Sequence, residues 1–454
     1  MHNFNGVVPE LALVCDHLPR RTEGGIGALM PWADKLWLIT YPSSGPGSGG
    51  GTGLFTVDAE MRLEKHPASV VGTYANRMIH PHTNQLIMGP HFITMDGDVR
   101  TVAAIQGHRL TATMLHLTDP ARLVYFLTME GLLFEVDVET LEATQLWDMN
   151  KELGLPEDAQ PHYKGAHTSQ GRIVVANNTY DEPEFKGERA AGRLAEYVDG
   201  QWRIIESTCF NEVTGRTNWD NVIFASGFDR ASAILRVCVG GKWSRYLLPK
   251  ASHCFDHYWQ TEWPRIREVE SERYLMDCHG MFYEFSPVLY EGKLWGVRPI
   301  STHLRITPDY CSWRGMLVLA GNQTTPIGDT NLLVGQPQAG LWFGKTDDLW
   351  QFGKPKGWGG PWWKAEVKAG EASDPFLMTG FDQKVLHLVN HGEKPVEVTV
   401  EVDFLGDGSW QEYDRMRLKP GMYWHHEFPA GFSAHWVRLR SAEDGKVTGY
   451  FVYS

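Results

Sequence analysis

Cysteines and long apolar runs are both scarce in this sequence, and each shortage excludes a class of protein. Six cysteines in 454 residues are too few for a disulfide-held scaffold, and no two of them form the CxxC pair common in zinc sites. No segment approaches the roughly 18 consecutive apolar residues of a membrane-spanning helix. The N-terminal segment shows neither a basic start nor a long apolar stretch. We therefore expect a cytoplasmic protein, or a secreted or periplasmic one if a signal has been removed.

Positive charge is also in short supply. Lysine and arginine number 42 against 55 acidic residues, and the net charge of -13 argues against a nucleic-acid-binding protein. A small anionic ligand is compatible with this balance, because a few arginines can reverse the sign of the charge inside one cleft. The GxSxG, Walker A and HExxH motifs are absent, and the glycine-rich stretch at 42–53 lacks the Lys-Ser/Thr of a phosphate loop.

What the chain does contain is the composition of an all-β protein. Tryptophan (18) and glycine (47) are abundant, and short apolar runs alternate with Gly, Asn and Asp turns. The runs form about seven packets, a pattern that predicts a seven-bladed β-propeller, with a sandwich plus barrel as the alternative. We predict a propeller carrying the site over 1–370 and a C-terminal antiparallel β-sheet or sandwich module over 371–454. The packets are 25–66, 76–104, 111–148, 162–207, 210–250, 261–302 and 303–368.

The first run of most packets is polar, which matters because the innermost strand of each propeller blade lines a central tunnel. Histidines recur in these runs, and imidazole can ligate a metal or move a proton near neutral pH. The alternative is that polar residues on such wet inner strands simply bond buried water. Our catalytic candidates are His80, His82, His116, Tyr163, Lys164 and His167, and our substrate-binding candidates are Arg77, His91, Asp220, Arg265, Arg267 and His303.

The segment HYKGAH (162–167) gathers two histidines and a lysine within six residues. On a regular strand His162 and Lys164 share one face, while Tyr163 and His167 lie on the other unless the glycine bends the chain. Tyrosine or histidine could serve as general base and acid, with the lysine as electrostatic partner. A turn whose lysine points to solvent is the alternative.

Two arginines in TEWPRIREV are two residues apart, so Arg265 and Arg267 share a strand face. Arginine suits a bidentate clamp on a carboxylate, and this pair would fit a uronic acid. The competing interpretation is an ion pair within the sheet, with partners among Glu262, Glu268 and Glu272.

A metal site is the least specific of these expectations. Nitrogen and sulfur ligands that tetrahedral zinc accepts recur in two neighbouring packets, with ordinary buried cysteine and histidine as the alternative. The candidate ligands are His253, Cys254, His257 and Cys278.

Several of these segments together resemble a known family. ANRMIHPHTNQL with GPHFI, LTATMLHLTDP, HYKGAHTSQGRIVVANN and TEWPRIREVESERYLMDCHGMFYE are similar to the seven-bladed propeller enzymes that act on rhamnose–glucuronate linkages. That group holds the L-rhamnose-α-1,4-D-glucuronate lyases, their relatives once described as rhamnosidases and, more remotely, the ulvan lyases. The resemblance covers about residues 24 to 350.

The resemblance implies β-elimination at a 4-linked glucuronate. A cation neutralises the carboxylate, a base removes the C5 proton, and an acid helps the 4-O-rhamnosyl group leave. By position, His80 or His82 and His116 would take the histidine roles, beside the 163–167 segment, and Arg265 would meet the carboxylate. Relatives also carry a calcium or zinc ion near the tunnel, and no organic cofactor is expected.

Two departures from the family pattern bear on this expectation. PSSGPGSGG lacks the histidine found there in rhamnosidase-like members, which disfavours a hydrolytic mechanism using that position. In GPHFI, His91 replaces an aromatic residue, which suggests a different substrate or a site richer in histidine. We expect a lyase on a uronic-acid-containing oligo- or polysaccharide, with no nucleic-acid or membrane partner. The alternatives are a glycoside hydrolase, or a propeller that binds a glycan or protein without catalysis.

Overall fold

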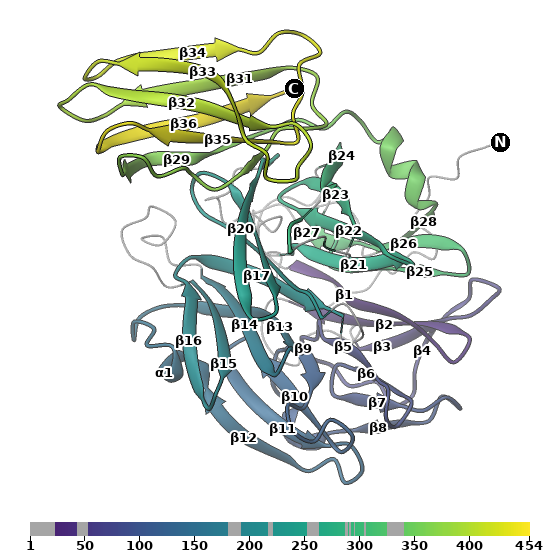
Figure 1. Cartoon of the computed structure of the whole chain (residues 1–454). Coiled ribbons are helices and arrows are strands. Elements are labelled where there is room, and N and C mark those ends of the chain that lie inside the picture. Colours follow the sequence, from purple (N-terminus) through teal and green to yellow (C-terminus); the bar gives the residue numbers. More distant parts are fainter. Residues whose placement is uncertain are drawn as a thin grey trace, which may run out of the picture. The chain divides into compact units, whose positions relative to one another are not determined.

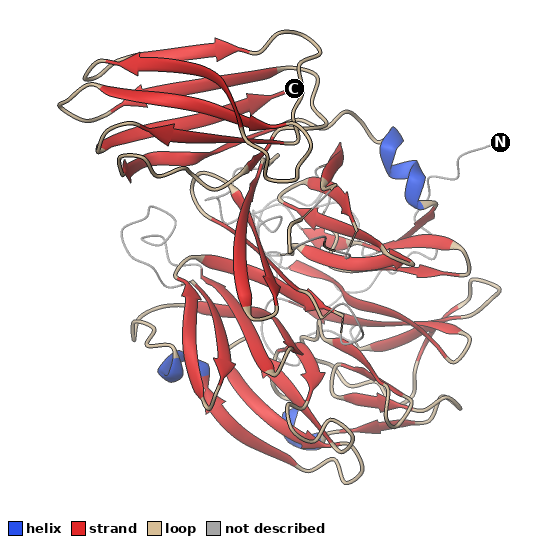
Figure 2. Ribbon diagram, viewed as in Figure 1, coloured by secondary structure: helices blue, strands red, loops and turns tan. Residues whose placement is uncertain are grey.

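The computed structural model consists almost entirely of β-strands (Figure 2). It describes residues 23–42, 53–179, 192–216, 221–251, 263–286, 289, 292–294, 296–303, 306–324 and 340–454. The chain divides into two compact units. Unit 1 comprises Met1–Asp181, Ala190–Thr217 and Arg305–Thr346, and unit 2 comprises Glu182–Arg189, Asn218–Leu304 and Asp347–Ser454.

Unit 1 is built from antiparallel meanders, in which consecutive strands pair in sequence order (Figure 1). The first two are β1 (Glu23–Trp32), β2 (Lys35–Pro42), β3 (Leu54–Val57) and β4 (Leu63–Lys65), then β5 (Arg77–His80), β6 (Gln85–Met88), β7 (His91–Ile93) and β8 (Val99–Thr101). The next two are β9 (Leu110–Leu115), β10 (Leu123–Thr128), β11 (Leu132–Asp137) and β12 (Ala143–Asp148), then β13 (Pro161–Ser169), β14 (Arg172–Thr179), β15 (Arg193–Val198) and β16 (Gln201–Glu206).

The remaining strands of unit 1 come from two later parts of the chain. They are β17 (Cys209–Gly215), the three-stranded meander β25 (Tyr310–Trp313), β26 (Met316–Ala320) and β28 (Leu341–Gly344), and the short β27 (Asn322–Thr324). β27 pairs with β1, so the start of the first meander is joined to a strand about 300 residues later. The helical elements are short: η1 (Ala103–Ile105), α1 (Met149–Glu152) and η2 (Thr346–Gln351).

Unit 2 continues the meander pattern. It contains β18 (Ile223–Phe228), β19 (Ala233–Val239) and β20 (Lys242–Leu248), followed by β21 (Arg265–Glu270), β22 (Arg273–Cys278), β23 (Met281–Phe285) and β24 (Arg298–Thr302). These boundaries follow most of the packets expected from the sequence, because each packet is a set of local apolar runs separated by tight turns. The packet 303–368 is the exception, since its last strand, Gly357–Val367, belongs to another sheet. The fold is therefore an all-β fold of the β-propeller class, as predicted.

The C-terminal part of unit 2 is a β-sandwich. One sheet has the order β29-β36-β31-β34, from β29 (Gly357–Val367), β36 (Gly445–Tyr453), β31 (Lys384–Asn390) and β34 (Tyr423–Glu427). The facing strands are β30 (Phe376–Leu377), β35 (Trp436–Ser441), β32 (Val396–Asp403) and β33 (Gln411–Leu418). A Cβ on Gly449 would lie 2.2 Å from Leu439 Cδ1, so the two sheets pack in close contact. β29 shows that the strands of this module begin before residue 371.

The first strands of the meanders in unit 1 lie next to one another, as the innermost strands of propeller blades do. Contacts run from β25 to β1, β5, β9, β13 and β17 in turn. The apolar core fills the space between successive meanders, with Phe92 of the second and Phe126 of the third in ring contact at 6.2 Å. This packing leaves the polar first strands and their loops to form the candidate site.

Candidate functional site

The chain enters three successive first strands at the same end of unit 1. Leu110 N–H donates to the carbonyl of Thr73 at 3.0 Å, which joins the start of β9 to the segment that leads into β5. Met129 N–H donates to the carbonyl of Arg109, and Tyr163 N–H donates to the carbonyl of Met129. The starts of β5, β9 and β13 are therefore neighbours, and we call this region the entry end.

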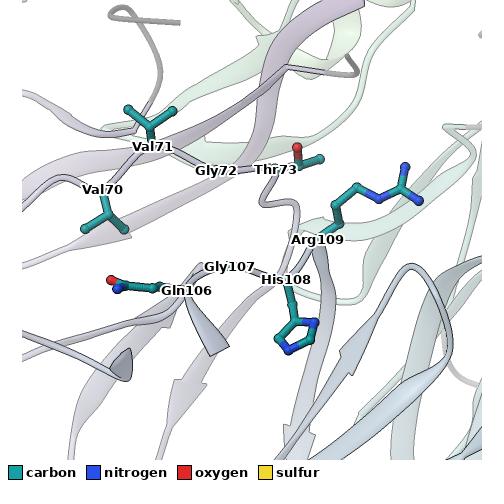
Figure 3. Close-up of a pocket in the computed structure, with 8 residues that line it drawn as sticks. All are labelled: Val70, Val71, Gly72, Thr73, Gln106, Gly107, His108 and Arg109. Atoms are coloured by element: carbon teal, nitrogen blue, oxygen red, sulfur yellow. The ribbon is translucent and has the colours of Figure 1, made fainter. Parts of the chain in front are cut away.

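A pocket of about 450 Å³ opens at the entry end. Two loops form its wall, residues 70–73 before β5 and residues 106–109 before β9 (Figure 3). His108 is partly exposed and its ring lies 5.2 Å from that of Phe134. Arg109 extends in a different direction from His108 (Figure 3) and pairs with Glu130 in the β10–β11 turn, with 2.5 Å between Nε and Oε1. The pocket thus combines an apolar wall with an imidazole and a guanidinium.

Next to this pocket the entry end carries a neutral imidazole under the influence of two cations. Burial lowers the pKa of His162 to about 2, and the positive charges of Lys164 and Arg109 act in the same direction. Lys164 is itself only 3% exposed. His162 is consequently uncharged at neutral pH.

A β-bulge decides which way the side chains of this segment point. Tyr163 lies opposite Asn177 and Gly165 lies opposite Ala176, so Lys164 is the extra residue between them. The bulge reverses the alternation that a regular strand would have. His162 and His167 therefore share one face, and Tyr163 lies on the other. The shared face of Tyr163 and His167 was expected only for a regular strand, and the irregularity next to Gly165 is the exception that the sequence analysis allowed for.

Tyr163 and His167 have different surroundings. Tyr163 is fully buried in the core between the third and fourth meanders, its ring 2.6 Å from where a Cβ on Gly131 would lie. Its hydroxyl has no hydrogen-bond partner among the described residues, and burial raises its pKa far above 10. His167 is partly buried, its Nε2 also lacks a partner within those ranges, and desolvation lowers its pKa to about 4. Neither of these two side chains joins the cluster at the entry end.

The histidines of the second and third meanders lie at the other end of their strands. His80 is the last residue of β5, and His116 follows the last residue of β9. β9 has six residues, and at roughly 3.4 Å per residue its two ends lie roughly 17 Å apart. His82, which is exposed, follows His80 in the same turn. The structure therefore does not bring His80, His82 and His116 together with Lys164.

Both end-of-strand histidines have protein partners. His80 is fully buried, with Nδ1 2.7 Å from Thr83 Oγ1 and Nε2 2.7 Å from the carbonyl of Pro120, and desolvation lowers its pKa. His116 Nε2 lies 2.9 Å from a carboxylate oxygen of Glu135. Its Nδ1 accepts the N–H of Asp119 at 2.9 Å. These contacts are those of turn-stabilising residues.

The two substrate-binding candidates of the second meander also have partners within the protein. Arg77 forms a buried ion pair with Asp309, with 2.7 Å between Nε and Oδ2, and donates to the carbonyl of Tyr310. His91 on β7 is fully buried, with Nδ1 2.9 Å from Thr101 Oγ1. Burial lowers the pKa of His91 to about 4.

Unit 2 brings together a different group of the predicted residues. Register places Arg265 and Arg267 on one face of β21, and Arg265 lies directly across from Asp277. Asp277 Oδ1 is 3.0 Å from Nε2 of His303, whose ring stacks on Phe282 at 4.3 Å. Arg265 is almost fully buried, with its guanidinium 5.0 Å from the ring of Trp263. The group is an arginine–aspartate–histidine cluster within one sheet.

The metal expectation stays a prediction, because most of its candidate ligands lie outside the residues that the structure describes. Asp220, His253, Cys254 and His257 lie outside them. Burial raises the pKa of Cys278 to about 12, and its Sγ lies 3.6 Å from Ser226 Oγ. Within the described ranges no three His, Cys, Asp or Glu side chains come together as metal ligands. The same ranges hold no helix with the length and apolar character needed to cross a membrane.

Sequence reasoning missed Arg109 and Glu130, whereas His108 belonged to the recurring histidines but was not among the candidate site residues. Arg109 directly precedes a strand and Glu130 sits in the turn of MEG, so each read as an ordinary loop residue. The sequence did hold one signal for this site. Arg109 and His162 are polar residues that lie at or just before the start of successive first strands. The Arg109–Glu130 pair joins residues 21 apart and carries no periodic signature.

Comparisons with known proteins give structural neighbours only. No family model matches the chain, and no curated protein matches it. Among solved structures, the β-propeller domain of Myceliophteria thermophila Cps50 (Swd1) has 10% identity and a TM-score of 0.39, with 65% of this chain and 94% of that chain covered.

Two further solved structures are similar at the same level of identity. The extracellular domain of a putative hybrid two-component system from B. thetaiotaomicron has 9% identity and a TM-score of 0.45, with 97% of this chain and 57% of that chain covered. A luciferin-regenerating enzyme has 9% identity and a TM-score of 0.38, with 60% and 91% covered. At these identities and TM-scores the similar structures assign no family to the chain. The chemistry of the site therefore has to be argued from its own residues.

Proposed function

We propose that the chain is a carbohydrate-active lyase that cleaves a 4-linked glucuronate by β-elimination, with its active site at the entry end. The observation that carries this proposal is the neutral imidazole of His162 under the influence of Lys164 and Arg109. The resemblance of HYKGAHTSQGRIVVANN and its companion segments to rhamnose–glucuronate lyases supports the same reaction.

The chemistry follows from the charges at the entry end. Lys164 neutralises the substrate carboxylate, and Arg109 does so by exchanging its partner Glu130 for that carboxylate. This makes the C5 proton more acidic because the charge of the developing carbanion spreads onto the carboxylate. His162 takes the C5 proton, and the electron pair of the C–H bond forms the C4–C5 double bond. The bond from C4 to the leaving oxygen breaks, and that oxygen takes up a proton, which we assign to His108 on the pocket wall.

Substrate binding also adjusts the strength of the base. In the free protein, burial and the two cations hold the pKa of His162 far below its ordinary value. A bound carboxylate offsets the charge of the cations and so raises the pKa of the imidazole. The imidazole is therefore a stronger base with substrate in place than in the free protein.

Digestion of rhamnosyl-glucuronate oligosaccharides tests the proposal. We expect ultraviolet absorbance from an unsaturated uronate and its loss, by about 100-fold or more in rate, in His162→Gln. His116→Gln is the matched control, since His116 lies at the far end of β9, and it should keep full turnover. Free rhamnose without absorbance would indicate a hydrolase. Unchanged turnover in His162→Gln would remove the assignment of the base.

A further inference from the structure

The sheet β29-β36-β31-β34 of the C-terminal sandwich has an unusual outer face. Strand alternation on β31 buries Leu386 and Leu388 and directs His387 outward. Register places His387 between His425 of β34 and Tyr450 of β36. The neighbouring outward positions hold Val385, Val389, Val452 and Tyr423, together with Glu427 and Thr448.

Apolar side chains on this outer face are exposed. Tyr423 is 56% exposed, Val452 42% and Trp363 39%. Trp363 meets Tyr450 edge to face at 5.6 Å, and the Arg230 guanidinium lies 5.4 Å from the Trp363 ring. A contiguous exposed apolar surface on a folded domain marks an interaction site more often than chance.

Two imidazoles and a phenol on the same face lie within reach of one another. His387 Nδ1 lies 3.0 Å from the hydroxyl of Tyr423, and their rings are nearly parallel at 6.0 Å. His425 is nearly parallel to Tyr423 at 5.9 Å. Desolvation, with a contribution from His425, lowers the pKa of His387, which keeps that ring neutral near pH 7. Ring faces and neutral donors and acceptors therefore alternate across the strands.

We infer that this outer face binds a stretch of the uronate-containing polysaccharide, through residues that take no part in the elimination. Sugar rings present C–H faces that pack on aromatic rings and hydroxyls that bond to imidazole and phenol groups. Arg230 over Trp363 adds a positive charge that complements a uronate carboxylate, in a chain whose net charge of -13 otherwise repels an acidic glycan. The identity of the glycan rests on the proposed function. The inference that this face binds a ligand rests only on the side chains described above.

Affinity electrophoresis with a soluble rhamnosyl-glucuronate polysaccharide tests this inference on the full chain. Trp363→Ala and Tyr423→Ala should each weaken retention about tenfold, and together more, while turnover of short oligosaccharides stays unchanged. Trp350→Ala and Phe404→Ala, which remove exposed aromatic residues outside this face, are the matched controls and should bind normally.

The outcomes separate the two proposals. Retention that depends on Trp363 and Tyr423 supports the binding face even if no unsaturated product ever forms. Normal retention of the double variant overturns it, whatever the enzyme activity. A dimer that the same substitutions dissociate, with no polysaccharide retention by the unmodified chain, would show that a second copy is the occupant and would also overturn it.

Discussion

At the scale of single residues, the proposed chemistry depends on the charge around one imidazole. His162 is neutral because burial and two nearby cations oppose its protonation. The same cations are what would attract and neutralise a uronate. Lys164 therefore has two effects at once, since it binds the substrate and suppresses protonation of the base.

Replacing Lys164 separates these effects. In Lys164→Met the pKa of His162 should rise, because one of the cations that lower it is gone. The imidazole then becomes protonated at higher pH, so the acid limb of the kcat/KM profile moves to higher pH, and kcat/KM falls by about 100-fold. Lys164→Arg should keep the acid limb in place. An unmoved limb in Lys164→Met would show that the lysine does not act on this base.

A second residue-scale prediction concerns stability. The pKa of fully buried His91 is about 4 in the folded protein, against about 6.5 when unfolded. The folded state thus prefers the neutral ring, and the contribution is complete above pH 6.5 and lost as the pH falls from 6.5 towards 4. The slope attributable to His91 is at most about 1.4 kcal/mol per pH unit. Urea unfolding of His91→Asn should show a flatter pH dependence in that window. The free energy of unfolding of His91→Asn at pH 7.5, where the ring of His91 is neutral in both states, measures the lost packing separately.

At the scale of elements, the bulge in β13 determines the orientation of the candidate site. Gly165 follows the bulged residue, and a Cβ there would lie 2.6 Å from the backbone nitrogen of Val213 and 2.9 Å from Glu212 Cα. Glycine is thus what allows β17 to approach β13. This approach fixes where Lys164 and His162 lie at the entry end.

Gly165→Ala should therefore destabilise the protein by about 1–3 kcal/mol, because the backbone of β17 must move to make room. Thermal unfolding at fixed pH measures the loss. Gly107→Ala is the control, since no atom lies within 4 Å of the added Cβ there. Equal melting temperatures for the two variants would contradict the close approach of β13 and β17.

The meanders were predictable and the site was only partly so, for a reason visible in this element. Strand packets arise from local alternation, and they matched the observed sheets. The faces of Tyr163 and His167 stayed open in the sequence, because the glycine of HYKGAH marks a possible irregularity without showing that Lys164 is the bulged residue. Pairing of Arg109 with Glu130 depends on which loops meet in space, which alternation does not encode.

At the scale of the whole molecule, one buried ion pair within unit 1 links three parts of the fold. Asp309 just before β25 is fully buried, pairs with Arg77 of β5 and accepts the N–H of Leu29 in β1 at 2.8 Å. A charge in such a position is costly to leave without its partner. The residues it joins are up to 280 positions apart, so no local pattern announces them.

Asp309→Ala should cost about 3–5 kcal/mol, because it leaves the Arg77 guanidinium buried without a counter-charge. The double variant Arg77→Met, Asp309→Ala should be more stable than Asp309→Ala alone, since it removes the uncompensated charge. Chemical unfolding of the unmodified protein, both single variants and the double variant gives the coupling. Additive losses would mean that the pair does not interact energetically.

The pairing of Glu23–Gly25 in β1 with Asn322–Thr324 in β27 has a consequence for synthesis in the cell. The ribosome adds about 5–20 residues per second, so the first strand waits roughly 15–60 s for its partner to emerge. During that interval one edge of the first sheet stays unpaired, and such an edge is open to association with other nascent chains. Translation speed and chaperone supply should therefore influence the yield of this protein.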